Sequence, residues 1–172
     1  MQGTAIAETV ALCEMLEECG APGSPNLLGA TMRERATVRM WQRRVEQQII
    51  LPSFDAYRWG SAWDFFSDRG MHALGIPHAA PQRQATARDQ LRWLDRLMAE
   101  AGSPDFICGD SLTLPDVQLF AILDWSANGG SGDGWWPDVL DDPGLEWVGG
   151  WFARCHARPS AIASDPRRAN KL

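Results

Sequence analysis

The sequence predicts an all-α protein, an irregular helical bundle packed around one central helix. Apolar residues recur at spacings of three and four along most of the chain, and no segment alternates convincingly as a strand would. One segment, residues 117–127, is apolar on nearly every side, which is typical of a helix buried at the centre of a bundle. At 172 residues, the chain is long enough for one domain with a sizeable core.

The N-terminal part of the chain predicts a short unit followed by a linker. A first helix is expected over residues 5–19, and Gly20 would end it. Residues 21–30 contain two prolines and two glycines, so this segment is the best candidate for a domain boundary. The expected organisation is therefore a helix within residues 1–20, a linker at 21–30 and a helical domain over 31–172.

The helical domain opens with a long helix at Thr31. Glu34 follows at the spacing of a capping box, in which the two residues satisfy each other's backbone amides. Pro52 interrupts this helix and should kink it, because proline has no amide hydrogen. Further helices are expected over about 81–101 and 145–156. The apolar faces of the three helices are formed by Val38, Trp41, Val45 and Ile49, by Ala87, Leu91, Leu94, Met98 and Ala101, and by Leu145, Val148, Phe152 and Cys155.

The stretch GDSLTLPDVQLF, residues 109–120, concentrates small polar side chains immediately before the central helix. Thr113 and Asp116 have the spacing of an N-cap residue and its partner, and Pro115 lies in the first turn, where its missing N–H costs nothing. A buried helix cannot satisfy its first amides with water and needs such a cap. We therefore interpret Thr113 and Asp116 as a structural cap, not as catalytic residues.

Composition excludes several classes of partner. A net charge of −6 and a pI near 5.0 argue against nucleic acid and membrane surfaces, and no apolar run could span a bilayer. The four cysteines form no CxxC pair and no signal peptide precedes them, so we expect reduced thiols in the cytoplasm. His72 and His78 are six residues apart with no neighbouring cysteine, and we expect no metal site.

Nine tryptophans are an unusual number for this length. Most are expected to pack in the core. The alternative is that some of them form the wall of a pocket for apolar or aromatic ligands.

Several segments together resemble the cytosolic glutathione transferase family. FICGDSLTLPDVQLFAILDW resembles the central helix of its C-terminal helical domain, which carries a buried Ser/Thr-x-x-Asp capping box. RATVRMWQRRVEQQIILP is similar to that domain's first long helix, WFARCHARPSAIAS to its last helix and SPNLLGAT to the interdomain linker. The resemblance covers nearly the whole chain and implies that residues 1–20 are the last helix of a thioredoxin-like domain.

The resemblance implies a set of binding residues. At the start of that last helix the family places an acid and a hydroxyl that hold the γ-glutamyl end of glutathione, and Glu8 and Thr9 match this pair. Glu46 matches a position where some classes place an acid near glutathione across a dimer interface. Glutathione would then be a substrate and not a resident cofactor.

A tentative apolar pocket is assigned by position on the long helix and the central helix. Its residues are Gln48, Pro52, Tyr57 and Trp125.

The family's thiol-activating Ser, Tyr or Cys belongs to a segment that no residue of this sequence matches. We therefore expect a truncated transferase-like protein that is inactive alone in conjugating glutathione to small electrophiles, and we assign no catalytic residue. The alternative is a non-catalytic helical module that binds an apolar ligand or a protein partner. In either case the apolar surface that the missing part would cover favours a homodimer.

Overall fold

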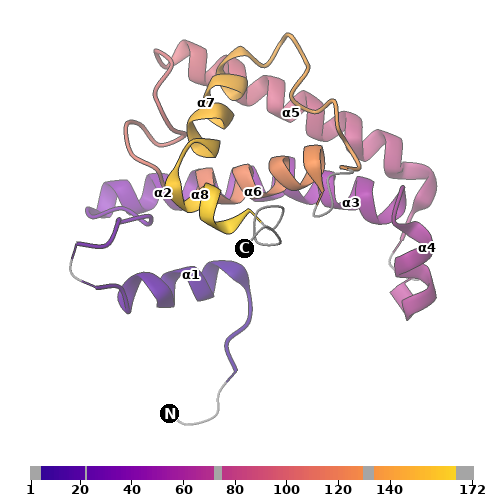
Figure 1. Cartoon of the computed structure of the whole chain (residues 1–172), viewed down its shortest axis with the longest axis horizontal. Helices are drawn as coiled ribbons and strands as arrows, with labels where there is room; N and C mark the ends of the chain where they lie inside the picture. The colour runs from indigo at the N-terminus through magenta and orange to yellow at the C-terminus, as the bar shows by residue number, and fades with distance from the viewer. Residues whose placement is uncertain (1–4, 22, 72–74, 130–133, 166–172) are drawn as a thin grey trace.

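The computed structural model describes residues 5–21, 23–71, 75–129 and 134–165. Within these ranges the chain is helical apart from turns and one isolated bridge between Phe106 and Gly109, which confirms the predicted all-α fold. Figure 1 shows α5 across the top of the molecule with α7 beneath it, α6 at the level of the continuous α2 and α3, and α1 set apart below. The elements are α1 (Thr9–Glu18), α2 (Met32–Val45), the π turn η1 (Glu46–Ile50), α3 (Leu51–Trp59), α4 (Trp63–Phe66), the π-type turn η2 (Ser67–Met71), the 3-10 turn η4 (Pro77–Ala79), α5 (Ala80–Glu100), α6 (Leu114–Asn128), α7 (Glu146–His156) and α8 (Pro159–Ser164).

The first helix is shorter than the sequence pattern suggests. It begins at Thr9 and not at residue 5, because Glu8 has φ 75° and ψ 125°, a conformation that cannot continue a helix backwards. The helix α1 has no buried residue. The large apolar side chains exposed on it and just before it are Ile6, Leu12, Met15 and Leu16. The described residues therefore cover the apolar face of α1 only in part.

The long helix passes through Pro52 without a break. Pro52 has no N–H, and its ring would collide with the carbonyl four residues earlier in a regular α-helix. The chain avoids the collision by widening into the π turn η1, where the N–H of Leu51 donates to the carbonyl oxygen of Glu46. Beyond Trp59 the chain is less regular: Gly60 caps the end of α3, and the short α4 and η2 follow.

The core is centred on α5 and α6. Leu91, Leu94, Leu119 and Leu123 are 0% exposed, and they pack with side chains from η1, from residues 136–139 and from α7. Three of the nine tryptophans, Trp136, Trp147 and Trp151, are buried, and the other six are partly buried. No helix in the described ranges has the length and hydropathy of a membrane span.

The start of α7 is capped by a residue from another helix. Leu145 precedes α7 and offers no side-chain cap, but the buried carboxylate of Asp95 on α5 accepts a hydrogen bond of 2.8 Å from the amide of Val148. A carboxylate at this position also opposes the positive end of the helix dipole. Asp95 therefore fixes the position of α7 on α5.

Gly149→Ala should stabilise the protein by about 0.5–1 kcal/mol, because glycine inside a helix costs that much relative to alanine. A Cβ at Gly149 would meet no heavy atom within 4 Å, so the methyl group fits without rearrangement. Urea denaturation followed by far-UV circular dichroism measures the change. Gly29→Ala is the opposite control: Gly29 has φ +92° and a Cβ there would lie 2.7 Å from the amide nitrogen of Arg35, so it should destabilise. A loss of stability in Gly149→Ala would contradict this account.

Candidate functional site

The N-terminal end of α1 combines an exposed acid with backbone strain. Glu8 precedes the helix with φ 75° and is one of only two described non-glycine residues with positive φ. Such a conformation costs of order 1–3 kcal/mol and persists where the surroundings or a function require it. Among the described contacts, Glu8 makes no side-chain capping bond, so the first amides of α1 are left for another acceptor. Thr9, the first helical residue, is also exposed.

Polar contacts hold α1 against the helical domain. The Glu17 carboxylate accepts hydrogen bonds from the amide of Leu27 at 2.8 Å and from that of Leu28 at 3.0 Å. The carbonyl oxygen of Leu27 in turn accepts one of 2.9 Å from the amide of Leu114 at the start of α6. Glu14 adds an ion pair of 2.7 Å with Arg39 on α2. Segment 21–30 is therefore tied both to α1 and to the central helix.

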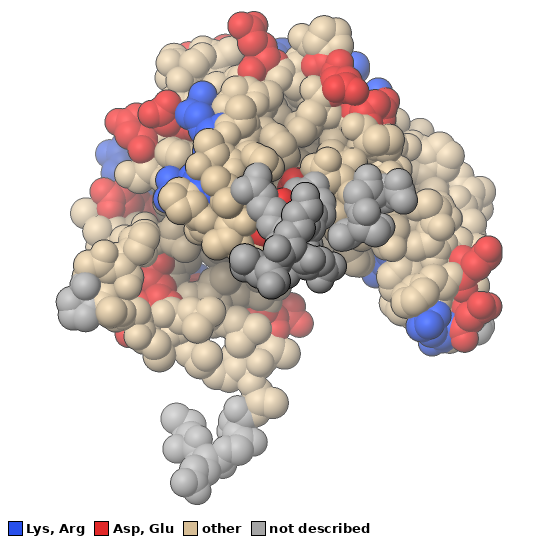
Figure 2. Space-filling view, in the orientation of Figure 1, with Lys and Arg blue, Asp and Glu red and all other residues tan. Residues whose placement is uncertain are grey.

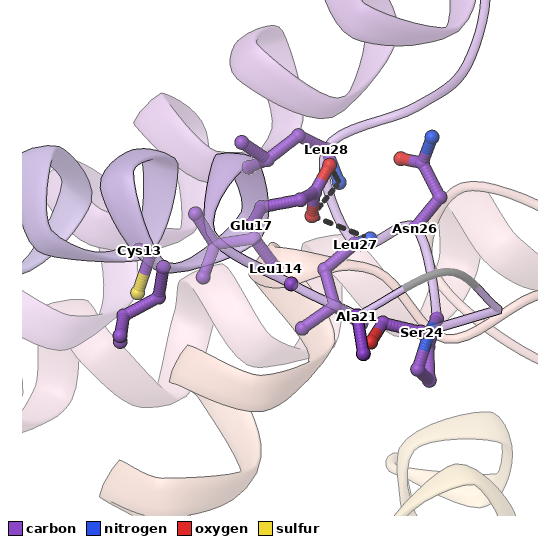
Figure 3. Close-up of a pocket in the computed structure, with 11 residues that line it drawn as sticks. Cys13, Glu17, Ala21, Ser24, Asn26, Leu27, Leu28 and Leu114 are labelled. Carbon is purple, nitrogen blue, oxygen red and sulfur yellow. Dashed lines mark hydrogen bonds between the residues drawn. The ribbon is translucent and has the colours of Figure 1, made fainter.

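Beside these contacts lies a half-open cavity of about 370 Å³, formed by α1, the segment that follows it and Leu114 at the start of α6. Figure 3 shows Cys13 and Glu17 of α1 on one side, with Leu27 and Leu114 opposite, and the Glu17 carboxylate directed at the two leucine amides. Because that carboxylate already accepts these bonds, the cavity is mainly an apolar space between two helices.

Glu46, the third residue matched to glutathione binding, has no described contact with α1 or with the cavity beside it. It begins η1, and its carboxylate accepts a hydrogen bond of 3.0 Å from the Gln42 amide and pairs with Arg43 at 3.5 Å. All these contacts lie within its own helical segment. The structure gives no contact that joins Glu46 to Glu8 or Thr9.

Of the four residues assigned to an apolar pocket, two lie together. The rings of Tyr57 and Trp125 are 4.6 Å apart, edge to face, and both contact Phe54 and Trp135. Pro52 is buried, with less than 2% of its surface exposed, whereas Gln48 is exposed. None of the four lines the cavity beside α1 or the groove described next.

A second hollow, a groove of about 400 Å³, runs between α6 and α8. It is lined by apolar side chains of both helices and by Cys155 at the end of α7. The carboxylates of Asp124 and Asp165 and the guanidinium of Arg158 also line it. An apolar groove with a few charged groups is the usual form of a small-molecule site.

Beneath this groove, Asp116 is the most extensively hydrogen-bonded side chain in the described core. It is 0% exposed. One carboxylate oxygen accepts from the amide and hydroxyl of Thr113 at 2.9 and 2.8 Å, and the other accepts from the Ile107 amide and Trp151 Nε1, both at 2.9 Å. Thr113 and Asp116 thus form a capping box, but the Thr113 hydroxyl donates to the carboxylate, and the Asp116 amide donates to the Thr113 carbonyl oxygen at 3.0 Å.

The two cysteines near Asp116 are poor nucleophiles. Burial raises the pKa of Cys155 to about 12, and the negative charge of Asp116 adds to the effect. Burial likewise raises the pKa of Cys108 to about 11. Both thiols therefore stay protonated at neutral pH, and neither can supply a thiolate.

Three important acids were not identified from the sequence: Glu17, Asp95 and Asp55. Asp55 on α3 pairs with Arg58 and, at 2.6 Å, with Arg83 on α5. Each of these acids bonds to a residue ten or more positions away in the sequence. Local residue spacing therefore could not reveal these contacts. Among the described residues no cluster of potential metal ligands occurs; His72 lies outside them.

Comparisons with solved structures show the same architecture in longer proteins. The chain is 20% identical to Gtt2 from Saccharomyces cerevisiae with a TM-score of 0.75, and the match covers 94% of this chain and 70% of that one. A Gtt2-class glutathione S-transferase of Vibrio parahaemolyticus is 24% identical with a TM-score of 0.68, and the match covers 92% of this chain and 66% of that one. A glutathione S-transferase domain-containing protein of Marinobacter aquaeolei is 25% identical with a TM-score of 0.72, and the match covers 91% of this chain and 68% of that one. The chain thus spans about two thirds of the length of these proteins.

A search of curated protein sequences gives no significant match. The family model described as "Glutathione S-transferase, C-terminal domain" matches residues 62–159, which is more than half of the chain. The match covers α4 to the start of α8, including the buried cap of α6. The chain therefore belongs to the glutathione S-transferase C-terminal domain family.

Proposed function

We propose that this chain contributes part of a glutathione site, with Glu8 and Thr9 holding the γ-glutamyl end of the tripeptide. The observation that carries the proposal is the strained backbone of Glu8 at the start of α1, next to amides without a side-chain cap. The Glu8 carboxylate would bind the ammonium group of glutathione. The Thr9 hydroxyl and the first amides of the helix would bind its α-carboxylate, because a helix N-terminus favours negative charge.

The shape of the molecule leaves room at this position. Figure 2 shows the molecule hollowed between the lobe that contains α1 and the lobe that contains α4. The N-terminal end of α1 is directed toward that hollow (Figure 1). A ligand held there would lie between the two lobes, which supports binding at Glu8 and not at the Glu17 end of the helix.

Calorimetry with reduced glutathione tests the binding. We expect a dissociation constant in the millimolar range, because one end of a tripeptide supplies only about −4 kcal/mol. Glu8→Gln should weaken binding at least about five-fold through loss of the charge-assisted bond. Glu18→Gln, at the other end of the same helix, is the matched control and should leave the affinity unchanged. Equal affinities in the two variants would exclude Glu8 as the ammonium ligand.

The 172-residue chain by itself should not accelerate the conjugation of glutathione to small electrophiles. Attack requires the thiolate, and a free thiol with a pKa of about 8.5 is little ionised at neutral pH. Tyr57, the single tyrosine, is packed among four aromatic rings on α3 and is not available to orient a thiol. An absorbance assay with a chloronitrobenzene substrate measures the rate. Turnover above the uncatalysed rate that Tyr57→Phe abolishes would contradict this expectation.

A second candidate function is a non-catalytic helical module that binds an apolar ligand or a protein partner. It is supported by the groove between α6 and α8 and by the exposed apolar side chains of α1. We propose that the latter favour a homodimer, with Glu46 near the glutathione of the other subunit as in some transferase classes. Light scattering decides the assembly: a monodisperse monomer at micromolar concentration would remove the support for it. Four free thiols support a reducing, cytoplasmic location.

A further inference from the structure

The helix α1 is attached to the helical domain mainly through polar contacts. It has ten residues, and none of them is buried. A helix of this length is only marginally stable by itself in water, because most helical stability in proteins comes from packing of an apolar face. The polar contacts are the bonds from the Glu17 carboxylate to two backbone amides and the ion pair between Glu14 and Arg39. Apolar burial of α1 is therefore incomplete.

The cavity beside α1 lies where this apolar contact is missing. Leu16 of α1 lines the cavity and is still 65% exposed, and Leu27, Leu28 and Leu114 line it from the rest of the chain. Figure 3 shows the Cys13 side chain of α1 among the residues around this space. A closed apolar cavity of about 150 Å³ can hold benzene. The half-open cavity of about 370 Å³ therefore has room for two fused aromatic rings.

The lining of the cavity disfavours charged ligands. Among the described residues that line it, Glu17 is the only charged side chain, and its carboxylate accepts bonds from the amides of Leu27 and Leu28. Its negative charge repels an anion, and the two amides already satisfy it, so a cation gains little there. Ser24 and Asn26 also line the cavity and are exposed, so they offer hydrogen-bond partners where it meets solvent.

We propose that the cavity between α1, the segment that follows it and the start of α6 is a binding site for a neutral bicyclic aromatic molecule with one polar substituent. The ligand covers Leu16 and Cys13 on one side and Leu27 and Leu114 on the other, so it supplies the apolar contact that α1 lacks. The inference rests on the second of the two proposed functions and assigns it a site and a class of ligand. The groove between α6 and α8 shares no lining residue with this cavity, so the two sites can be told apart.

Calorimetry with 2-naphthol tests the binding, because this probe is neutral at pH 7 and has two fused rings and one hydroxyl. Naphthalene-2-sulfonate, an anion with the same rings, is the matched control ligand. It should bind at least about ten-fold more weakly, because Glu17 repels it.

Two variants of α1 locate the bound ligand. Cys13→Phe places a ring in the cavity and should lower the affinity for 2-naphthol at least about ten-fold by steric exclusion. Cys19→Phe makes the same change at an exposed position of the same helix outside the cavity, and should leave the affinity within about two-fold of the parent. Neither change replaces a buried residue, so both variants should keep the far-UV circular dichroism of the parent chain.

The ligand should also protect the Cys13 thiol. The raised pKa values of Cys108 and Cys155 slow their alkylation, so iodoacetamide reports mainly on Cys13 and Cys19. Fragment-ion mass spectrometry resolves the two sites. When 2-naphthol fills about nine tenths of the cavities, Cys13 should react about ten-fold more slowly. Cys19 lies outside the cavity and should react at an unchanged rate.

The failures of the site and of the proposed function can be distinguished. If 2-naphthol bound with equal affinity to the parent and to Cys13→Phe, or bound without protecting Cys13, the ligand would lie elsewhere. The cavity assignment would then be overturned while the second proposed function stands. If calorimetry detected no binding of 2-naphthol, both the cavity assignment and the apolar-ligand form of that function would be overturned. Equal affinities for 2-naphthol and the sulfonate would contradict the preference for a neutral ligand.

Discussion

Asp116→Ala should lower the free energy of unfolding by about 4 kcal/mol or more. The substitution removes the acceptor of four hydrogen bonds, from Thr113 twice, from Ile107 and from Trp151, in a site that is 0% exposed. Each buried donor left without a partner costs about 1–3 kcal/mol. Since a domain of this size is stable by about 5–15 kcal/mol, the variant should lose a large fraction of its total stability. Guanidinium denaturation followed by tryptophan fluorescence measures the loss.

Two comparisons separate the carboxylate network from the helix cap alone. Thr113→Ala removes one of the four donors and should cost about 1–2 kcal/mol. Asp110→Ala, an exposed acid in the same loop, should change stability by less than about 0.5 kcal/mol. If Asp116→Ala were no worse than Thr113→Ala, the contacts to Ile107 and Trp151 would contribute nothing, and the account of Asp116 as the link between α6, α7 and the preceding loop would fail.

Asp55→Ala should cost about 2–3 kcal/mol. The Asp55 side chain is 12% exposed and joins Arg58 on its own helix to Arg83 on α5, so its loss leaves two guanidinium groups facing each other across the α3–α5 contact. Removing one partner of a fully buried pair costs about 3–5 kcal/mol, and the lower figure reflects the 28% and 34% exposure of the two arginines. The shift of the thermal midpoint, measured by calorimetry, reports the change.

The control for this prediction is an ion pair at the surface. Asp138 pairs with Arg88 at 3.3 Å and is 63% exposed, so Asp138→Ala should cost less than about 0.5 kcal/mol. High salt should leave the penalty of Asp55→Ala largely intact, because buried charges are screened much less than exposed ones. Similar penalties for the two variants would show that the α3–α5 pair is energetically a surface pair.

The parts of this structure that could be read from the sequence are those set by neighbouring residues. Thr31 and Glu34 form the expected capping box, with Glu34 accepting from the Thr31 amide at 3.0 Å and the Glu34 amide donating to the Thr31 hydroxyl at 3.2 Å. Helices α5, α6 and α7 lie within a few residues of their expected bounds, because apolar spacing and caps act over three or four positions.

The remainder depends on contacts that no local pattern encodes. Asp95 caps α7 from 53 residues away, and Trp151 reaches Asp116 over 35 residues. The capping pair at 113 and 116 was visible in the sequence, but its links to Ile107 and Trp151 were not. For the candidate site, the match of Glu8 and Thr9 came from the resemblance to a family, and the backbone strain at Glu8 became visible only in three dimensions.

The π turn between α2 and α3 determines which residues of α3 face the interior of the protein. Each residue of an α-helix advances by about 100°, so one extra residue in a wider turn shifts the downstream faces by that angle. With this shift, Ile49 within the turn and Ala56 beyond it both reach the interior, and Tyr57 meets Trp125. Deleting a single residue from Glu46–Ile50 would keep the composition of the helix but re-aim α3, turning its buried carboxylate and aromatic rings away from α5 and α6. At this point in the fold, chain length is therefore a stricter constraint than side-chain identity.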